Sequence, residues 1–208
     1  ILELMGRYAG WIALHAGLAG GAHAILLPEM PYDTRAVWQR ITNRFRRERG
    51  FSLVVISEGA RPRGQGHAIA EEREHPEGLP VLGGAGLRLR HDLELLYRQE
   101  SQAMLEAGQY PPDAPEIRAV VLGHIQRGGS PDAQDRIIAT ACGAYAVEMV
   151  DRGLFGQMSA WGHDGPTHVP LSEATVPHLV EPDTDPLVEV ARSVGICLGE
   201  PLDDRAVV

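Results

Sequence analysis

The opening part of the chain alternates between short, mainly apolar runs and longer segments with the spacing of helices. The apolar runs cover residues 1–5, 24–27 and 53–56, and the helical patterns between them cover 11–18 and 33–45. Strands that read as continuous apolar runs are buried on both faces, as in a parallel sheet covered by helices. We therefore predict an α/β fold with a parallel sheet and helices on both of its faces.

The alternation is broken at residues 59–116 and resumes after them. Arg61–Pro80 is rich in Gly, Pro, His and Glu and is typical of an exposed excursion, whereas Leu87–Leu105 has the pattern of one long helix. The elements predicted after this segment are a strand at 117–122, a helix with Ser130 as N-cap and Pro131 at its first position, a strand pair at 158–161 and 167–169, and a terminal helix at 187–194.

Charge and composition argue against several classes of protein. The net charge is −9, so a nucleic-acid binder, which needs a basic face, is disfavoured. No apolar run has the length of a membrane span, and no signal peptide is visible. The two cysteines, Cys142 and Cys197, make no disulfide framework, which predicts a reducing, cytoplasmic location. Because Ile1 lies inside an apolar run, we expect the chain to be cut from a longer one rather than processed at that point.

Polar residues and glycines follow three of the predicted strands. In open α/β sheets, ligands bind beyond the carboxyl ends of the strands. The three segments at such ends are Met5-Gly6-Arg7, Ser57-Glu58-Gly59 and the run from Gly123 to Pro131.

The third segment carries the strongest chemical signal. His124 and Arg127 follow a strand, and Gly128-Gly129 allows a ligand to approach the backbone before a helix begins. A helix N-terminus attracts anions, and an arginine can hold a phosphate with two hydrogen bonds. This pattern predicts a phosphate-ester site; the alternative is an ordinary turn with the arginine in solvent.

Glu58 and Arg7 each allow two interpretations. Glu58 is either a helix cap or ion-pair partner, or an acceptor for sugar hydroxyls. Arg7 is either a solvated loop residue or a cation that offsets charge on a transferring phosphoryl group.

Taken together, these segments resemble those of 6-phosphofructokinases. The resemblance rests on Met5–Trp11, on Glu58 at a strand end, and on the run Gly-His-Ile-Gln-Arg-Gly-Gly-Ser-Pro from Gly123 to Pro131, followed by Asp135-Arg136. It covers residues 1–199 and is similar to the later part of such a subunit. The most similar branch is the actinobacterial type, which has ATP-using and pyrophosphate-using members.

The resemblance implies a role for each matching residue. Arg7 is expected to stabilise the transferring phosphoryl group, Glu58 to bind the sugar hydroxyls, and Arg118 to reach into the sugar site of a neighbouring subunit of a homo-oligomer, either a dimer or a tetramer. The segment His124–Arg127 is expected to hold the substrate phosphate. The fructose 6-phosphate-binding residues implied are Met5, Gly6, Arg7, Glu58, Arg118, His124, Ile125, Gln126 and Arg127.

The resemblance also implies a division of the molecule. Residues 1–150 would form the acceptor-binding α/β domain, with an excursion at about 59–116, and residues 151–199 would return to an N-terminal domain, leaving 200–208 as a loose tail. The glycine-rich nucleotide loop, the Mg²⁺-binding acidic residue and the catalytic base are expected upstream of Ile1. Mg²⁺ with ATP, or pyrophosphate, would therefore be bound mainly by that missing part, and no cofactor or metal ligand is expected in this chain.

These expectations combine into one functional hypothesis. We expect a glycolytic 6-phosphofructokinase that transfers phosphate from ATP to the 1-hydroxyl of fructose 6-phosphate, with this chain inactive alone. The alternatives are a pyrophosphate-dependent enzyme, a non-catalytic sugar-phosphate-binding or regulatory chain, and a partner that only completes an assembly. His23 stands where ADP-activated members carry a glutamate, which argues against that regulation, although Arg47 and Arg49 remain as candidate anion contacts.

Overall fold

The computed structural model describes residues 1–47, 50–74 and 80–200. It divides into two compact units. Unit 1 contains Ile1–Gln126 together with the chain from Leu179 onward, and unit 2 contains Arg127–His178. The tail predicted at 200–208 and the candidate contact Arg49 fall, apart from Glu200, outside the described residues.

Unit 1 is built around a four-stranded parallel sheet in the order β2-β3-β1-β6. The strands are β1 (Leu2–Leu4), β2 (Ala24–Leu26), β3 (Val54–Ser57) and β6 (Val120–Val121). In the register of the sheet, Leu2 lies opposite Val55 on β3 and opposite Val120 on β6. The parallel sheet predicted from the apolar runs is confirmed.

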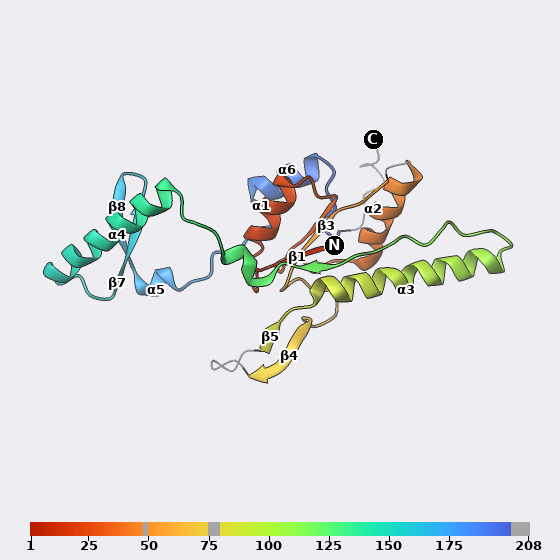
Figure 1. Cartoon of the computed structure of the whole chain (residues 1–208), viewed down its shortest axis with the longest axis horizontal. Helices are drawn as coiled ribbons and strands as arrows, with labels where there is room; N and C mark the ends of the chain where they lie inside the picture. The colour runs from red at the N-terminus through yellow and green to blue at the C-terminus, as the bar shows by residue number, and fades with distance from the viewer. Residues whose placement is uncertain (48–49, 75–79, 201–208) are drawn as a thin grey trace. The chain divides into compact units, whose positions relative to one another are not determined.

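Two pairs of helices cover the two faces of this sheet (Figure 1). Helices α1 (Trp11–Ala19) and α6 (Pro186–Ser193) lie on one face, and α2 (Thr34–Arg46) and α3 (Ala85–Glu106) lie on the other. The strands supply both cores, because successive side chains point to opposite faces. Ile25 and Val55 pack toward α1 and α6, whereas Leu26, Val54 and Ile56 pack toward α2 and α3.

The helix boundaries in unit 1 follow from identifiable caps. The Asp33 side chain accepts a hydrogen bond of 2.8 Å from Arg35 N and begins α2, as predicted. Helix α3 begins at Ala85 after Gly84 in the left-handed conformation, and Gly84 offers no side chain to cap it. The cap comes instead from β1: the buried carboxylate of Glu3 accepts hydrogen bonds from Gly84 N at 2.9 Å and Gly86 N at 2.7 Å.

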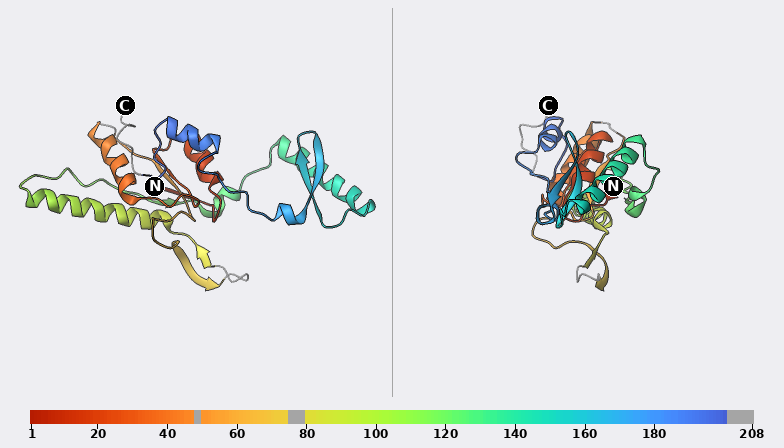
Figure 2. Two further views of the ribbon diagram at one scale, coloured as in Figure 1. Left: turned by 180° about the vertical axis from the view of Figure 1, so that it is seen from behind. Right: turned by 90° about the vertical axis from the view of Figure 1, so that its left-hand side faces the viewer.

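The excursion between β3 and β6 contains structure that the sequence pattern did not predict. Strands β4 (Ile69–Glu74) and β5 (Pro80–Leu82) form an antiparallel pair beside the start of α3, as both views of unit 1 show (Figures 1 and 2). Four of the six residues of β4 are charged, so the strand lacks the alternation of apolar and polar residues by which strands are recognised.

Unit 2 is a helix packed on a two-stranded antiparallel hairpin. It contains α4 (Ala133–Asp151), β7 (Gln157–Gly162), β8 (Gly165–Pro170) and the short α5 (Leu171–Ala174). The predicted strand pair is confirmed and is longer than expected. Ser159 Oγ on β7 donates to Cys142 O on α4 at 2.9 Å, and so ties the hairpin to the helix.

The predicted start of α4 is wrong by two residues. Ser130 is not the N-cap and Pro131 is not the first helical residue, because the helix begins at Ala133 with Asp132 as its cap. Asp132 accepts from Asp135 N at 2.9 Å, and Asp135 accepts from Asp132 N at 3.0 Å. This reciprocal capping box satisfies two backbone donors at the start of the helix and so places the cap two residues beyond Ser130. No helix in the described ranges is both long enough and apolar enough to cross a membrane.

Candidate functional site

The carboxyl ends of β1 and β3 place two of the candidate segments side by side. Leu4 lies opposite Ser57 in the register, and Glu58 N extends the ladder by donating to Leu4 O at 2.8 Å. Directly beyond this point, Gly6 N donates to Glu58 Oε1 at 3.3 Å. The glycine and the carboxylate, which lie 52 residues apart in the sequence, are therefore adjacent in the fold.

The third candidate segment, which follows β6, contacts the Met5-Gly6-Arg7 segment from the other side of β1. Met5 N donates to Gln126 Oε1 at 3.3 Å, and Gln126 Nε2 donates to Gly123 O at 2.9 Å. Gln126 lies on a short 3₁₀ helix, η1 (Gly123–Arg127), that follows β6. Unit 1 thus brings residues of all three candidate segments together at one edge of its sheet.

The side chains at this edge differ in exposure. Arg7 and Glu58 are half-buried, while His124 and Ile125 are exposed. The guanidinium carbon of Arg7 lies 5.8 Å from the centroid of the Tyr8 ring, within the range of a cation–π contact. One carboxylate oxygen of Glu58 holds Gly6 N. Since a carboxylate has several acceptor positions, Glu58 keeps capacity to accept hydrogen bonds from a ligand.

Two of the predicted residues are not placed at this edge by the structure. Arg118 precedes β6 and lies at the opposite, amino edge of the sheet, where its carbonyl accepts from the Ile1 amino group at 2.7 Å. Its side chain is 81% exposed and pairs with Glu116. Arg127 is exposed and is the first residue of unit 2.

His23 has a structural partner of its own. Its Nδ1 accepts a hydrogen bond of 2.8 Å from Leu53 N, and its ring lies edge-on to Phe51. Burial lowers the pKa of His23, and the positive charges of Arg44 and Arg40 lower it further. The neutral ring therefore joins the chain before β2 to the chain before β3.

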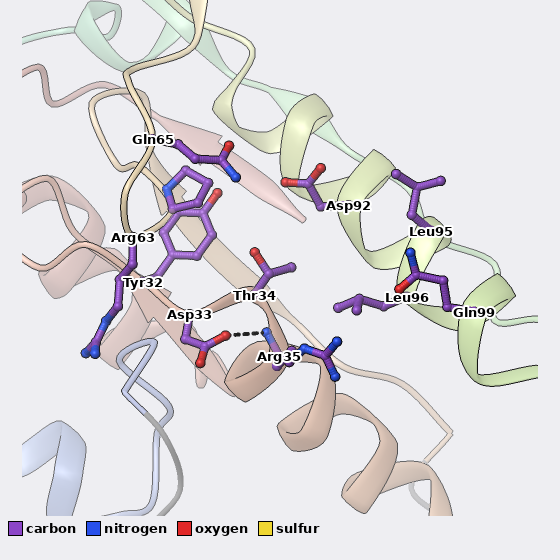
Figure 3. Close-up of a pocket in the computed structure, with 11 residues that line it drawn as sticks. Tyr32, Asp33, Thr34, Arg35, Arg63, Gln65, Asp92, Leu95, Leu96 and Gln99 are labelled. Carbon is purple, nitrogen blue, oxygen red and sulfur yellow. Dashed lines mark hydrogen bonds between the residues drawn. The ribbon is translucent and has the colours of Figure 1, made fainter. Parts of the chain in front are cut away.

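Sequence reasoning missed a cavity of about 450 Å³ in unit 1. Figure 3 shows it between the first turn of α2, the loop around Pro62–Gln65 and one side of α3. The Tyr32 hydroxyl beside it is buried and has no hydrogen-bond partner among the described residues, and its pKa is raised by burial and by Asp92. The cavity includes none of the predicted site residues. Its walls come from three segments that are separate in the sequence, so no local sequence pattern predicts the cavity.

The described part of the chain contains no cluster of three or more His, Cys, Asp or Glu residues arranged to hold a metal ion. No chemical step is therefore assigned to a metal held by such a cluster.

Comparisons of the chain with a family model, with curated proteins and with solved structures all point to one family. A family model described as Phosphofructokinase matches residues 1–150. The chain is 44% identical over 205 residues to an ATP-dependent 6-phosphofructokinase of Chloroflexus aurantiacus, covering 97% of this chain and 50% of that protein. It is 41% identical over 176 residues to a pyrophosphate–fructose 6-phosphate 1-phosphotransferase of Amycolatopsis methanolica, covering 84% and 46%. The chain spans about half the length of the curated relatives it matches.

A solved structure shares the fold. The pyrophosphate-dependent phosphofructokinase of Marinobacter aquaeolei superposes with a TM-score of 0.59 at 25% sequence identity. The match covers 98% of this chain and 49% of that one.

Proposed function

Because the chain belongs to the phosphofructokinase family, we propose that the protein is a 6-phosphofructokinase that transfers a phosphoryl group from ATP to the 1-hydroxyl of fructose 6-phosphate. The products are fructose 1,6-bisphosphate and ADP, a step of glycolysis, and we place the enzyme in the cytoplasm. The observation that carries the proposal is the convergence of Met5-Gly6-Arg7, Glu58 and Gln126 at the carboxyl edge of the sheet.

The residues at this edge would act on the sugar. Glu58 would accept hydrogen bonds from the sugar hydroxyls with the acceptor positions that Gly6 leaves free. Arg7 would offset the negative charge on the phosphoryl group as it moves, a role in which a positioned cation stabilises the transition state more than the ground state. Met5 and Gly6 would line the sugar site beside Arg7.

The 6-phosphate would be held by the segment that follows β6. His124 and Arg127 would donate to its oxygens, and Ile125 and Gln126 would shape the segment. Arg118 would serve the site of a neighbouring subunit in a homo-oligomer. Its exposed side chain at the amino edge supports this assignment, because it does not meet the carboxyl-edge residues within unit 1.

We assign ATP as donor because the relatives named for ATP include one at 44% identity. Mg²⁺ would neutralise charge on the donor when bound. The donor and the ion would be held mainly by residues outside these 208, in keeping with relatives about twice as long. Pyrophosphate is the second candidate donor, since a relative at 41% identity is named for it.

The acceptor site is tested by calorimetric titration of this chain with fructose 6-phosphate, using fructose as the ligand without phosphate. We expect saturable binding of the ester only. Arg127→Ala should weaken it by about 1.5–3 kcal/mol, the scale of a charged hydrogen bond. Arg152→Ala removes an exposed arginine that pairs with Glu148 in the same unit and should leave the affinity unchanged. Equal binding by both variants would contradict the assignment.

The reaction is tested with the product of the complete reading frame. Formation of fructose 1,6-bisphosphate with ATP supports the proposal, and formation with pyrophosphate alone favours the second donor. Binding of fructose 6-phosphate without transfer from either donor would instead indicate a non-catalytic sugar-phosphate-binding chain.

A further inference from the structure

Both polar backbone groups of Gly6 are held by three consecutive residues at the carboxyl end of β3, namely Ser57, Glu58 and Gly59. Ser57 Oγ donates to Gly6 O at 2.9 Å, and Gly59 N donates to the same carbonyl at 3.0 Å. On the other side of the residue, Gly6 N donates to Glu58 Oε1 at 3.3 Å. The carbonyl of the peptide that leads from Gly6 into Arg7 is therefore fixed by Ser57 and Gly59, and Glu58 holds the N–H of the preceding peptide.

The close packing around the Gly6–Arg7 peptide requires glycine at residues 6 and 59. Gly6 has φ of +143°, which side-chain-bearing residues rarely adopt, and a Cβ on it would lie 2.3 Å from Ser57 Oγ. A Cβ on Gly59 would lie 1.9 Å from Arg7 O and 2.7 Å from Arg7 C. Any side chain at residue 59 would thus push directly against the backbone of Arg7.

Ser57 is fully buried, at 0% exposure, so its hydroxyl is not available to a substrate. A buried hydroxyl costs free energy unless it is hydrogen-bonded, and here it is bonded to the Gly6 carbonyl. In this geometry the Ser57 side chain contacts no ligand and instead holds the peptide that leads into Arg7.

We propose that Ser57 and Gly59 are positioning residues that set the location of the Arg7 guanidinium by clamping the Gly6–Arg7 peptide. This inference rests on the proposed function, because it is the phosphoryl-transfer role of Arg7 that makes its placement matter. A cation displaced from the reacting group by about 1 Å can lower a rate by a large factor while substrate binding is little changed.

The test compares matched variants of the product of the complete reading frame. Ser57→Ala removes the hydroxyl, and Ser57→Thr keeps it. Ser52→Ala is the control, because Ser52 Oγ is buried and has no hydrogen-bond partner among the described residues. A second pair is Gly59→Ala and Gly66→Ala, since a Cβ on Gly66 meets nothing within 4 Å. The measurements are kcat, KM for fructose 6-phosphate, and hydrogen exchange of residues 4–8 and 57–60.

We expect Ser57→Ala to lower kcat about tenfold with KM changed less than about twofold, and Ser57→Thr to restore most of kcat. Gly59→Ala should lower kcat further. Both variants should exchange faster at residues 4–8, and the controls should match the wild type. A kcat for Ser57→Ala within about twofold of the wild type, or an equal loss in Ser52→Ala, would overturn the inference.

A failure of the proposed function has a separate signature. If the wild type transfers no phosphate, the function is wrong, and hydrogen exchange alone decides whether the clamp exists. Faster exchange at residues 4–8 in Ser57→Ala but not in Ser52→Ala supports the clamp, whereas unchanged exchange in both refutes it.

Discussion

At the scale of single residues, unit 1 uses the buried carboxylate of Glu3 and the half-buried carboxylate of Glu29 to hold backbone amides from distant segments. Glu3 binds Gly84 N and Gly86 N at the start of α3. Glu29 Oε1 accepts from Gly10 N at 3.0 Å, just before α1, and from Val180 N at 2.9 Å. Each carboxylate thereby replaces water at amides that the fold removes from solvent. These residues fasten elements that local sequence does not connect.

Replacing Glu3 by glutamine tests this role. The variant keeps one acceptor oxygen but turns an amide donor toward a backbone donor. We expect the free energy of unfolding to fall by about 1–3 kcal/mol, the cost of leaving a buried group unsatisfied. Urea denaturation measures it. Glu94→Gln is the control, since Glu94 forms a surface pair with Arg90 in α3; an equal loss there would contradict the interpretation.

Replacing Tyr32 by phenylalanine should change the free energy of unfolding in the opposite direction. The hydroxyl is buried without a hydrogen-bond partner among the described residues, while the ring belongs to the core beside α2 and α3. Removing the hydroxyl should raise the free energy of unfolding by roughly 1 kcal/mol, because the unfolded chain loses a hydrated group that the folded chain does not satisfy. Thermal and urea denaturation measure the change. A destabilised variant would show that the hydroxyl has a partner in solution.

His23 should make stability depend on pH. Its pKa in the folded state is lowered, first by burial and then by Arg44 and Arg40, so the unfolded chain binds a proton more readily. The contribution of neutral His23 to stability is complete above the pKa of about 6.5 that histidine has in the unfolded chain. It is lost as the pH falls through that value toward the lower pKa of the folded state. Relative to His23→Gln, the wild type should lose stability between pH 7 and 5. His91→Gln, at an exposed position of α3, should leave the pH profile of the wild type unchanged.

At the scale of elements, caps decide where helices begin. The capping box of α4 is formed by Asp132 and Asp135, and not by Ser130. Asp132→Ala should destabilise the start of α4 by about 0.5–2 kcal/mol. Hydrogen exchange of residues 133–137 measures this as faster exchange. Ser130→Ala should have no such effect; a larger effect at Ser130 than at Asp132 would reverse the assignment of the cap.

Sequence patterns predicted the elements that obey a single local rule. The apolar runs at 24–27 and 53–56 gave buried strands, and Asp33 gave the start of α2. The long helix predicted at 87–105 is confirmed as α3, but a distant residue sets its start: Glu3 caps α3 from β1, and no pattern near Gly84 reveals it. For the site, the three strand ends were found from sequence, but the clamp on Gly6 depends on the register of β1 and β3, which a single sequence does not display.

At the scale of the whole molecule, the proposed sharing of sites between subunits makes a quantitative prediction. In a dimer that mixes Arg7→Ala and Arg118→Ala subunits, one of the two sites has both arginines. Random assembly should therefore restore about a quarter of the wild-type activity, although each variant alone is impaired. Co-expression followed by assay of the unseparated random mixture measures this, and the mixed dimer purified with two different tags should have about half of the wild-type activity. Activity no greater than the sum of the separate variants would contradict a role for Arg118 across an interface.

The bond network around Glu3 also bears on the order of folding events. Glu3 lies 81 and 83 residues from the amides that it binds at the head of α3. The body of α3 can form from contacts within its own sequence, but its first turn must wait until this long loop has closed, and closure across such separations is slow. The head of α3 should therefore be unformed when the folding barrier is crossed, so that changes at Glu3 accelerate unfolding and leave the refolding rate nearly unaltered.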